Sequence, residues 1–184
     1  MKIIVGITGA SGSIYGLRLI EVLKEAGHQV HVVLTDSGEQ VVKYECPENY
    51  DRVLKSADML HDVHNIGASI ASGSFRADAM VVVPASMKTV ASIATGVTDN
   101  LLTRAADVML KEGRQLILVP REAPMHAGHL ENLLKAAKIG AVIIPACPGF
   151  YHKPSSIMDL VDMLVGKICD RMGIDNNLFQ RWNG

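Results

Sequence analysis

The segment Gly6–Gly16, with the sequence GITGASGSIYG, has the composition of a loop that binds phosphate. Gly9 and Gly12 allow tight turns and a close approach of the backbone to a ligand. Ser11 and Ser13 carry hydroxyl donors, and Ser13 could also cap the helix that follows. Because the segment joins an apolar run to an amphipathic one, a helix N-terminus would face the bound anion. An ordinary strand-to-helix turn has a similar composition, so the loop alone leaves both interpretations open.

The spacing within this loop excludes the two commonest nucleotide sites. The G-x-G-x-x-G pattern of dinucleotide sites is absent, and the second apolar run ends in Leu34-Thr35 rather than in an acidic residue that would bind a ribose. The Gly-Lys-Ser/Thr ending of a P-loop is also absent. A mononucleotide with one phosphate therefore fits the loop better than NAD or ATP.

Two later loops also combine groups that bind anions. Ser86-Met87-Lys88-Thr89 follows an apolar run and opens a helical pattern, so it offers two hydroxyls, an ammonium group and free backbone N–H groups. A simple helix cap would explain these residues equally well. The Arg121-Glu122 pair lies in a short loop between Pro120 and Pro124, where a functional charge pair is favoured over a solvated one.

Other charged and metal-binding residue types form no pattern that predicts a site by itself. Arg104 and Lys111 are seven residues apart on one expected helix face, for which a solvated surface is the default interpretation. His61-x-x-His64 and His126-x-x-His129 have no third ligand at a recognisable spacing. We therefore expect no metal site.

The composition indicates a globular protein of the cytoplasm. The 184 residues are 48% hydrophobic and 20% charged, and the net charge of −1 gives no basic field for nucleic acid or an anionic membrane. Three widely spaced cysteines form no CxxC pair, so neither a zinc ribbon nor a disulfide framework is expected. No signal-peptide core is visible, and no uncharged apolar run reaches the roughly 20 residues that span a bilayer.

Short Val/Ile-rich runs alternate with helical patterns along the chain. The predicted strands are residues 2–8, 30–34, 79–83, 115–119 and 141–144, with Pro84, Pro120 and Pro145 ending the last three. The predicted helices are residues 13–26, 39–44, 86–112 with a break near Gly96, 129–139 and 156–172. Residues 46–65 give no clear period. This alternation predicts one doubly wound α/β domain over residues 1–184, Rossmann-like or flavodoxin-like, with a mainly parallel sheet.

Ligands of such sheets bind beyond the carboxyl ends of the strands. Five loops start there, after Thr8, Leu34, Val83, Val119 and Ile144. They gather hydroxyls, small residues and prolines. This is the composition of a small-molecule pocket that binds a phosphate and leaves room for a flat ring.

The chain resembles the flavin prenyltransferase family of the UbiX type, which lies within a group of flavin-binding, homo-oligomeric enzymes that includes cysteine decarboxylases. Four stretches carry the resemblance: GITGASGSIYGLRL, PASMKTVASIATG, DNLLTRAADVMLKEGRQLILVPREAPMHAGHLENLL and GAVIIPACPGFYHKPSSIMDLVDMLVGKICDRMGI. They cover nearly the whole chain apart from about residues 45–75. The PRE-x-P loop and the P-x-x-P-x-FYH-x-P loop are its most specific motifs.

The resemblance implies an enzyme that joins a dimethylallyl group, from dimethylallyl phosphate, to N5 and C6 of reduced FMN. Prenylated FMN then serves a partner decarboxylase. Family members assemble from trimers, commonly into dodecamers, with active sites at subunit interfaces. The absence of a D-D-x-x-D motif favours a mechanism that requires no metal.

The resemblance also assigns roles to individual residues. Those implied to bind FMN are Gly9, Ala10, Ser11, Thr35, Ser86, Met87, Lys88, Thr89, Arg121 and, reaching a flavin in a neighbouring subunit, Arg104. Those implied to surround dimethylallyl phosphate are Lys111, Arg121, Glu122, Tyr151 and Lys167, with Trp182 closing over the site. Glu122 is the implied proton-handling carboxylate, and Ser11 and Glu45 complete the catalytic set.

Some positions depart from the family pattern, and two other functions stay open. Thr35 and Ala85 stand where Ser and Cys are usual, and Lys167 replaces a common Arg, which could weaken phosphate binding. The first alternative is an FMN-dependent, cysteine-type decarboxylase, although such enzymes carry an early catalytic His and no His here precedes His28. The second is a non-catalytic, flavodoxin-like FMN carrier.

Overall fold

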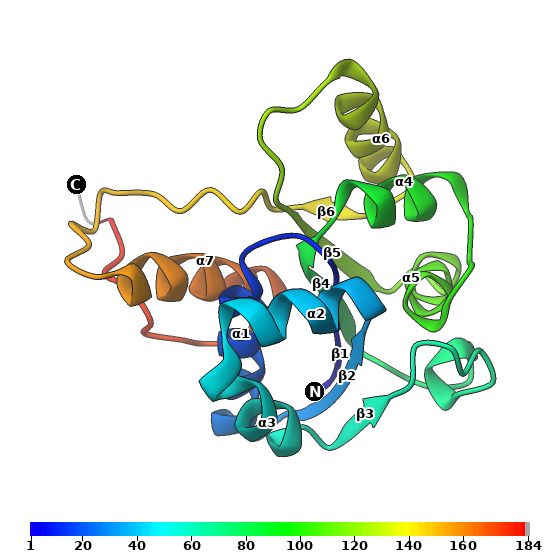
Figure 1. The fold of residues 1–184 in the computed structure, drawn as a ribbon, viewed down its shortest axis with the longest axis horizontal. Coiled ribbons are helices and arrows are strands. Elements are labelled where there is room, and N and C mark those ends of the chain that lie inside the picture. Colours follow the sequence, from blue (N-terminus) through cyan, green and yellow to red (C-terminus); the bar gives the residue numbers. More distant parts are fainter. Residues whose placement is uncertain (183–184) are drawn as a thin grey trace.

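Six strands form one parallel sheet in the order β3-β2-β1-β4-β5-β6 (Figure 1), in a computed structural model that describes residues 1–182. Their bounds are β1 (Lys2–Ile7), β2 (Gln29–Leu34), β3 (Met59–His61), β4 (Ala79–Ala85), β5 (Gln115–Pro120) and β6 (Val142–Ile143). This is the strand order of the Rossmann fold rather than of flavodoxin. The direction of winding reverses between β1 and β4, so the switch point lies there.

Helices cover both faces of the sheet (Figure 1). Their bounds are α1 (Ser13–Glu25), α2 (Asp36–Glu45), α3 (Pro47–Ser56), the 3-10 turn η1 (Ser69–Ala71), α4 (Met87–Thr95), α5 (Leu101–Lys111), α6 (Ala127–Lys138) and α7 (Ile157–Met172). The cores on the two faces are built by alternation along the strands, because successive side chains of a strand point to opposite faces. Ile3 and Val5 pack with α1, α3 and α7, whereas Ile4 packs with α4 and α5.

The structure confirms the predicted doubly wound fold and corrects two details. The predicted helix over residues 86–112 breaks as expected, since Gly96 follows α4 in the left-handed conformation (φ 75°). Pro84 does not end β4, because the ladder to β5 shifts register between Val82 and Ala85 and so tolerates a residue without an N–H. Ser13 does not cap α1, because Gly12 stands at the cap position with φ 102° and Ser13 is buried in the first turn.

Residues 46–65, which the sequence pattern left unassigned, contain α3 and the edge strand β3. β3 has three residues and two of them are exposed, so it has too little buried surface to show a period. No helix within residues 1–182 is long and apolar enough to span a membrane.

Candidate functional site

A polar cavity of about 530 Å³ lies at the carboxyl ends of β1, β2 and β4, beside the switch point. Its lining residues come from five separate segments of the chain, and they are Gly9, Thr35, Asp36, Ser37, Val63, His64, Ser86, Lys88, Thr89, Asp99 and Asn100. Ligands of doubly wound sheets bind at this position. The volume is within the range of small-molecule sites.

Three helix N-termini meet at this cavity. The Thr35 hydroxyl caps α2 by accepting the Gly38 N–H at 3.0 Å. The Ser86 hydroxyl caps α4, and the Asn100 side chain caps α5 by accepting the Thr103 N–H at 2.9 Å. Each helix therefore presents its positive end and its remaining free N–H groups to one space. This arrangement favours a bound anion such as phosphate.

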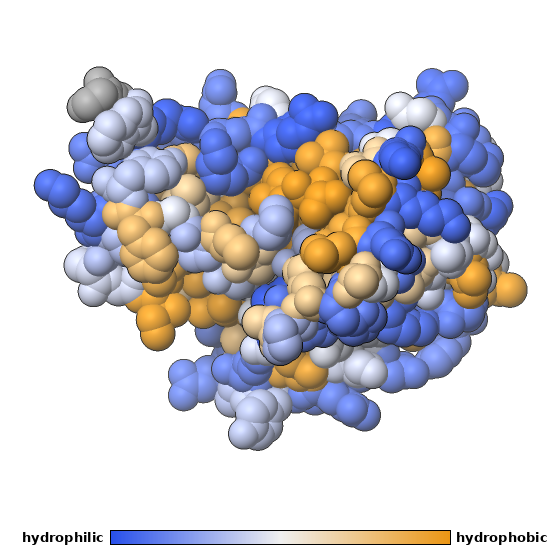
Figure 2. Space-filling model, turned by 90° about the horizontal axis from the view of Figure 1, so that it is seen from above, coloured by the Kyte–Doolittle hydropathy of each residue, from blue (hydrophilic) through white to orange (hydrophobic). Residues whose placement is uncertain are grey.

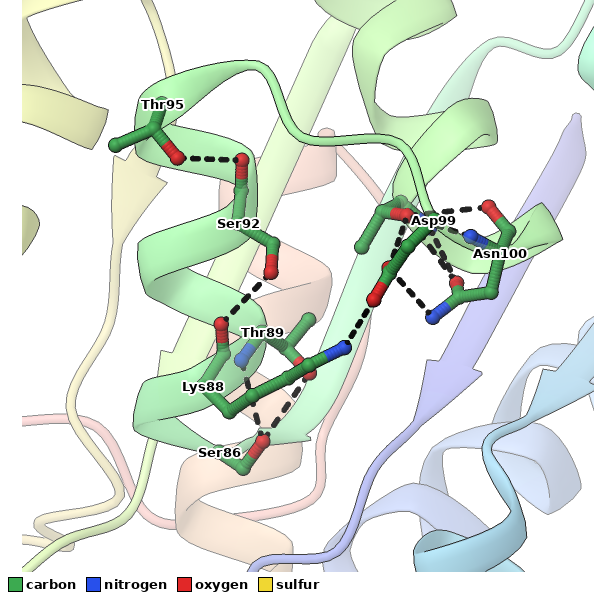
Figure 3. A network of polar contacts seen from close by, with 8 residues as sticks. Ser86, Lys88, Thr89, Ser92, Thr95, Asp99 and Asn100 are labelled. Carbon is green, nitrogen blue, oxygen red and sulfur yellow. Dashed lines mark hydrogen bonds and ion pairs between the residues drawn. The ribbon is translucent and has the colours of Figure 1, made fainter.

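An ion pair spans the cavity wall between α4 and α5. The Lys88 ammonium group lies 2.7 Å from Asp99 Oδ2, and Figure 3 shows the Lys88 side chain extended from α4 toward the loop that precedes α5. The hydrogen bond from Lys88, together with its charge, lowers the pKa of Asp99. The second carboxylate of the cavity, that of Asp36, lies 3.0 Å from His64 Nε2. The Asp99 carboxylate is thus paired with a cation, and the Asp36 carboxylate has a hydrogen-bond partner in His64.

Thr8 and Gly9 close the base of the cavity. Thr8 is fully buried, and its hydroxyl donates to the Pro84 carbonyl at 2.8 Å and accepts the Ser86 N–H at 2.7 Å. A Cβ atom on Gly9 would lie 2.6 Å from Ser37 Cβ. Glycine at this position therefore lets the loop after β1 touch the loop after β2.

The N-terminus of α1 is occupied by a carboxylate of the protein itself. Glu45 Oε2 accepts the backbone N–H groups of Gly12 and Ser13, each at 2.9 Å. Burial raises the pKa of Glu45, but hydrogen bonds from Ser11, Ser13 and Gly12 together outweigh it and lower the pKa. The sequence predicted that a ligand anion would face this helix. In the structure that anion is Glu45.

Arg121 joins three of the loops at the carboxyl edge. Its Nε donates to the Ser11 carbonyl at 3.1 Å, and its backbone N–H donates to the Ala85 carbonyl at 3.3 Å. Glu122 accepts the N–H of Ala123 at 3.1 Å, and it is half-buried like Arg121. The structure therefore brings together Ser11, Arg121 and Glu122, which the resemblance had assigned to one site.

A second hollow of about 450 Å³ separates α7 from the segment after β6. Lys167 lines it together with Cys147 and Met163. Nearby, the rings of Tyr151 and Trp182 meet edge to face with their centroids 6.1 Å apart.

Four of the predicted residues lie elsewhere in this chain. Ala10 and Met87 are buried, and Met87 packs in the core beneath α4. Arg104 pairs with Asp107 at 2.7 Å, and Lys111 pairs with Glu112 at 2.5 Å. Neither Arg104 nor Lys111 lines the cavity at the switch point of its own chain.

Sequence reasoning did not select six lining residues, namely Asp36, Ser37, Val63, His64, Asp99 and Asn100. Asp36 and Ser37 follow β2 directly, so their position at the carboxyl end of a strand is the sequence feature that could have identified them. His64 lies in the region without a period, and the Asp99-Asn100 pair connects two helices rather than following a strand. Within residues 1–182 no group of three or more His, Cys, Asp or Glu side chains is placed to hold a metal ion.

Comparison with known proteins gives consistent matches over nearly the full chain. The family model described as Flavoprotein matches residues 1–171. A relative from Methanothermobacter thermautotrophicus named flavin prenyltransferase UbiX is 47% identical over 182 residues, which are 99% of this chain and 95% of the relative.

Two crystal structures have the same fold with a TM-score of 0.97 each. One is a UbiX protein in complex with FMN and dimethylallyl pyrophosphate, which is 44% identical and is matched over 100% of this chain and 97% of its own. The other is a dodecameric, FMN-dependent, UbiX-like decarboxylase from Escherichia coli O157:H7, 42% identical over the whole of both chains.

Proposed function

The chain belongs to the flavin prenyltransferase family of the UbiX type, and on this premise we propose that it joins a dimethylallyl group from dimethylallyl phosphate to N5 and C6 of reduced FMN. The observation that supports this most strongly is the cavity at the switch point, where the N-termini of α2, α4 and α5 meet. Such a cavity fits a ligand with one phosphate and a flat ring.

The donor groups around the cavity fit FMN. Thr35, Ser86, Lys88 and Thr89 offer hydroxyls and an ammonium group to the phosphate and ribityl oxygens. Gly9, Ala10, Met87 and the Ser11-Arg121 contact would form the flavin side through backbone groups and close packing, with Arg104 added by a neighbouring copy. Reduced FMN bound there would supply nucleophilic nitrogen and carbon atoms.

Four side chains would stabilise the departing phosphate. As the carbon–oxygen bond of dimethylallyl phosphate breaks, its electron pair leaves with the phosphate, and Lys111, Arg121, Tyr151 and Lys167 bind the resulting charge. Lys111 lies on α5 outside its own cavity, so we propose that it acts in the site of a neighbouring copy. Tyr151 and Trp182 would exclude water, which would otherwise trap the allylic cation.

Glu122 would handle the proton that is released on ring closure. It is half-buried beside Arg121, and it lies in the loop that contacts the glycine loop through Ser11. A carboxylate in this place can accept a proton and pass it to solvent or to the departed phosphate. Ser11 and Glu45 would keep the opposite wall in position, since both bond within the glycine loop.

We further propose that copies of the chain assemble as trimers and then as a dodecamer. Figure 2 shows apolar side chains gathered on the face seen from above, the side on which α6 lies in Figure 1. Large exposed apolar side chains include Leu130 and Leu134 of α6, together with Phe150 and Ile157. Exposed apolar surface of this kind marks protein interfaces. The prenylated FMN would then pass to a partner decarboxylase.

Two alternatives make different demands on the residues. A cysteine-type decarboxylase would need a catalytic His early in the chain. His28 lies at the amino end of β2, opposite the carboxyl edge, and the His64 side chain that lines the cavity is engaged by Asp36. A flavodoxin-like carrier would need no second set of cations such as Lys111 and Lys167. The prenyltransferase would use the groups around the cavity for FMN and these further cations for the departing phosphate.

One incubation separates the prenyltransferase from the other two functions. The purified chain is incubated without oxygen with reduced FMN and dimethylallyl phosphate, and the mass of the released flavin is measured. A flavin enlarged by one C5H8 unit supports the proposal, and an unchanged FMN contradicts it. Lys167→Met should reduce the yield, whereas Lys138→Met, which removes an exposed lysine at the end of α6, serves as the matched control.

A further inference from the structure

We propose that Asp170 is a positioning residue that fixes the C-terminal segment, residues 174–182, so that Trp182 stays on Tyr151 and Lys167 stays free to bind an anion. The effect on substrate binding rests on the proposed prenyltransferase function. The placement of the segment does not depend on that function.

The segment runs back along α7 (Figure 1) and is held there by polar and apolar contacts. The Asn176 side chain donates to the Gly166 carbonyl at 3.3 Å and to Asp170 Oδ1 at 3.0 Å. The Phe179 ring packs on Gly166, where a Cβ atom would lie 2.6 Å from the ring. The absence of a side chain at position 166 therefore lets the segment lie flat against the helix.

Asp170 makes the strongest of these contacts. The two terminal guanidinium nitrogens of Arg181 donate to its two oxygens, at 2.9 and 2.7 Å, and the same guanidinium group lies over the Phe179 ring at 5.3 Å. Bidentate pairing fixes direction as well as distance. Arg181, followed by Asn176, holds the pKa of Asp170 below its ordinary value. The carboxylate therefore stays charged and paired at neutral pH.

Trp182 depends on this anchor. It follows Arg181 directly, and its side chain is 71% exposed, so its packing comes mainly from the edge-to-face contact with Tyr151. An exposed aromatic pair by itself fixes the direction of a ring only weakly. The direction of the indole ring is therefore set largely by the fixed position of Arg181.

The Asp170–Arg181 pair also engages the carboxylate that lies next to Lys167 on α7. Lys167 precedes Asp170 by three residues on α7, a spacing at which opposite charges meet on a helix surface. Both oxygens of Asp170 are nevertheless engaged by Arg181 and Asn176, and within residues 1–182 Lys167 makes no ion pair. Without Arg181, the Asp170 carboxylate would be free to pair with Lys167. The Asp170 carboxylate would then compete with a bound phosphate for Lys167.

Trp182 is the only tryptophan of the chain, so fluorescence reports its position directly. In flavin-free protein, Asp170→Asn and Arg181→Gln should each lower the anisotropy of Trp182, because the residue before it loses its anchor, and should raise acrylamide quenching only slightly, because the side chain is already 71% exposed. Asp175→Asn removes a neighbouring exposed charge of the same segment that attracts Arg181 at longer range but bonds to neither residue, and it should change both signals much less. Arg181→Lys keeps the charge but not the bidentate geometry, and it should be intermediate. Unchanged anisotropy in folded Asp170→Asn and Arg181→Gln proteins would overturn the proposal.

Prenylation kinetics then test the effect on Lys167. Arg181→Gln should raise KM for dimethylallyl phosphate about ten-fold, and Asp170→Asn about three-fold, because only the first variant leaves a free carboxylate beside Lys167. The double variant should resemble Asp170→Asn rather than the sum of the two changes. A KM for the double variant that equals or exceeds that of Arg181→Gln would overturn the Lys167 part of the proposal. A wild-type chain that does not prenylate FMN would overturn the proposed function, while the fluorescence would still decide where Trp182 lies.

Discussion

Glu45 Oε2 accepts the backbone N–H of Gly12 at 2.9 Å, across 33 residues of sequence, and so places a carboxylate of the protein at the N-terminus of α1. A helix N-terminus stabilises such a charge. Because Glu45 is the last residue of α2, the contact also ties the end of α2 to the glycine loop. The Gly12 and Ser13 N–H groups that the glycine loop was expected to offer to phosphate therefore bond to Glu45, whereas the N-termini of α2, α4 and α5 lie at the cavity.

We predict that Glu45→Gln lowers the free energy of unfolding by about 0.5–1 kcal/mol at pH 7, since the amide keeps one acceptor but loses the charge. The pKa of Glu45 is lowered in the folded state, so its contribution is present above the unfolded pKa and is lost as the pH falls through the folded pKa. Urea unfolding of both proteins from pH 7 down to pH 3 measures this. A difference that stayed constant over that range would contradict a role for the charge.

Gly9→Ala tests the packing at the base of the cavity. The new Cβ atom would lie 2.6 Å from Ser37 Cβ, so one of the two loops must move, and FMN affinity should fall about ten-fold or more. Titration of FMN by fluorescence quenching gives the affinity. Gly67→Ala is the control, because its Cβ atom would make only an ordinary contact, 3.4 Å from Asn65 Oδ1. Equal affinities for the two variants would argue against the close approach at Gly9.

The sequence predicts most of the fold because burial is periodic along most of the strands and helices. Ile3, Ile4 and Val5 are all buried, as expected for a parallel sheet covered on both faces, and Gly96 stops α4 by backbone geometry alone. The cavity is partly predictable for the same reason, since the carboxyl ends of parallel strands share one edge. Thr35 and Ser86 were expected in one site from that rule, and they line one cavity.

The remaining parts depend on contacts that no local pattern encodes. Glu45 reaches Gly12 from the end of a different helix, and Asp99 reaches Lys88 from a connection between two helices. Arg104 and Lys111 do not line the cavity of their own chain, so the roles proposed for them would need a second copy, which a single sequence does not place. Long-range pairing of polar groups is therefore the part of the site that the sequence pattern does not predict.

The Lys88-Asp99 pair provides a charge test of where the phosphate binds. Asp99→Asn removes a negative charge from the cavity wall and should tighten FMN about two- to five-fold, whereas Lys88→Met should weaken it about five-fold. Isothermal titration with FMN gives both values. Riboflavin, which has the flat ring but no phosphate, is the matched ligand, and its affinity should change in neither variant. Equal effects on both ligands would show that the phosphate lies elsewhere.

Glu122→Gln tests the proposed proton transfer. The amide keeps the shape of the side chain and can still accept the Ala123 N–H, so FMN affinity and the fold should be unchanged. It cannot take up a proton, so kcat for prenylation should fall about 100-fold or more with KM nearly constant. Anaerobic single-turnover mixing with reduced FMN, followed by mass analysis of the flavin, measures the step directly. Glu131→Gln, on the exposed side of α6, is the matched control and should react at the wild-type rate. Wild-type turnover by Glu122→Gln would remove this carboxylate from the mechanism and leave the departed phosphate as the base.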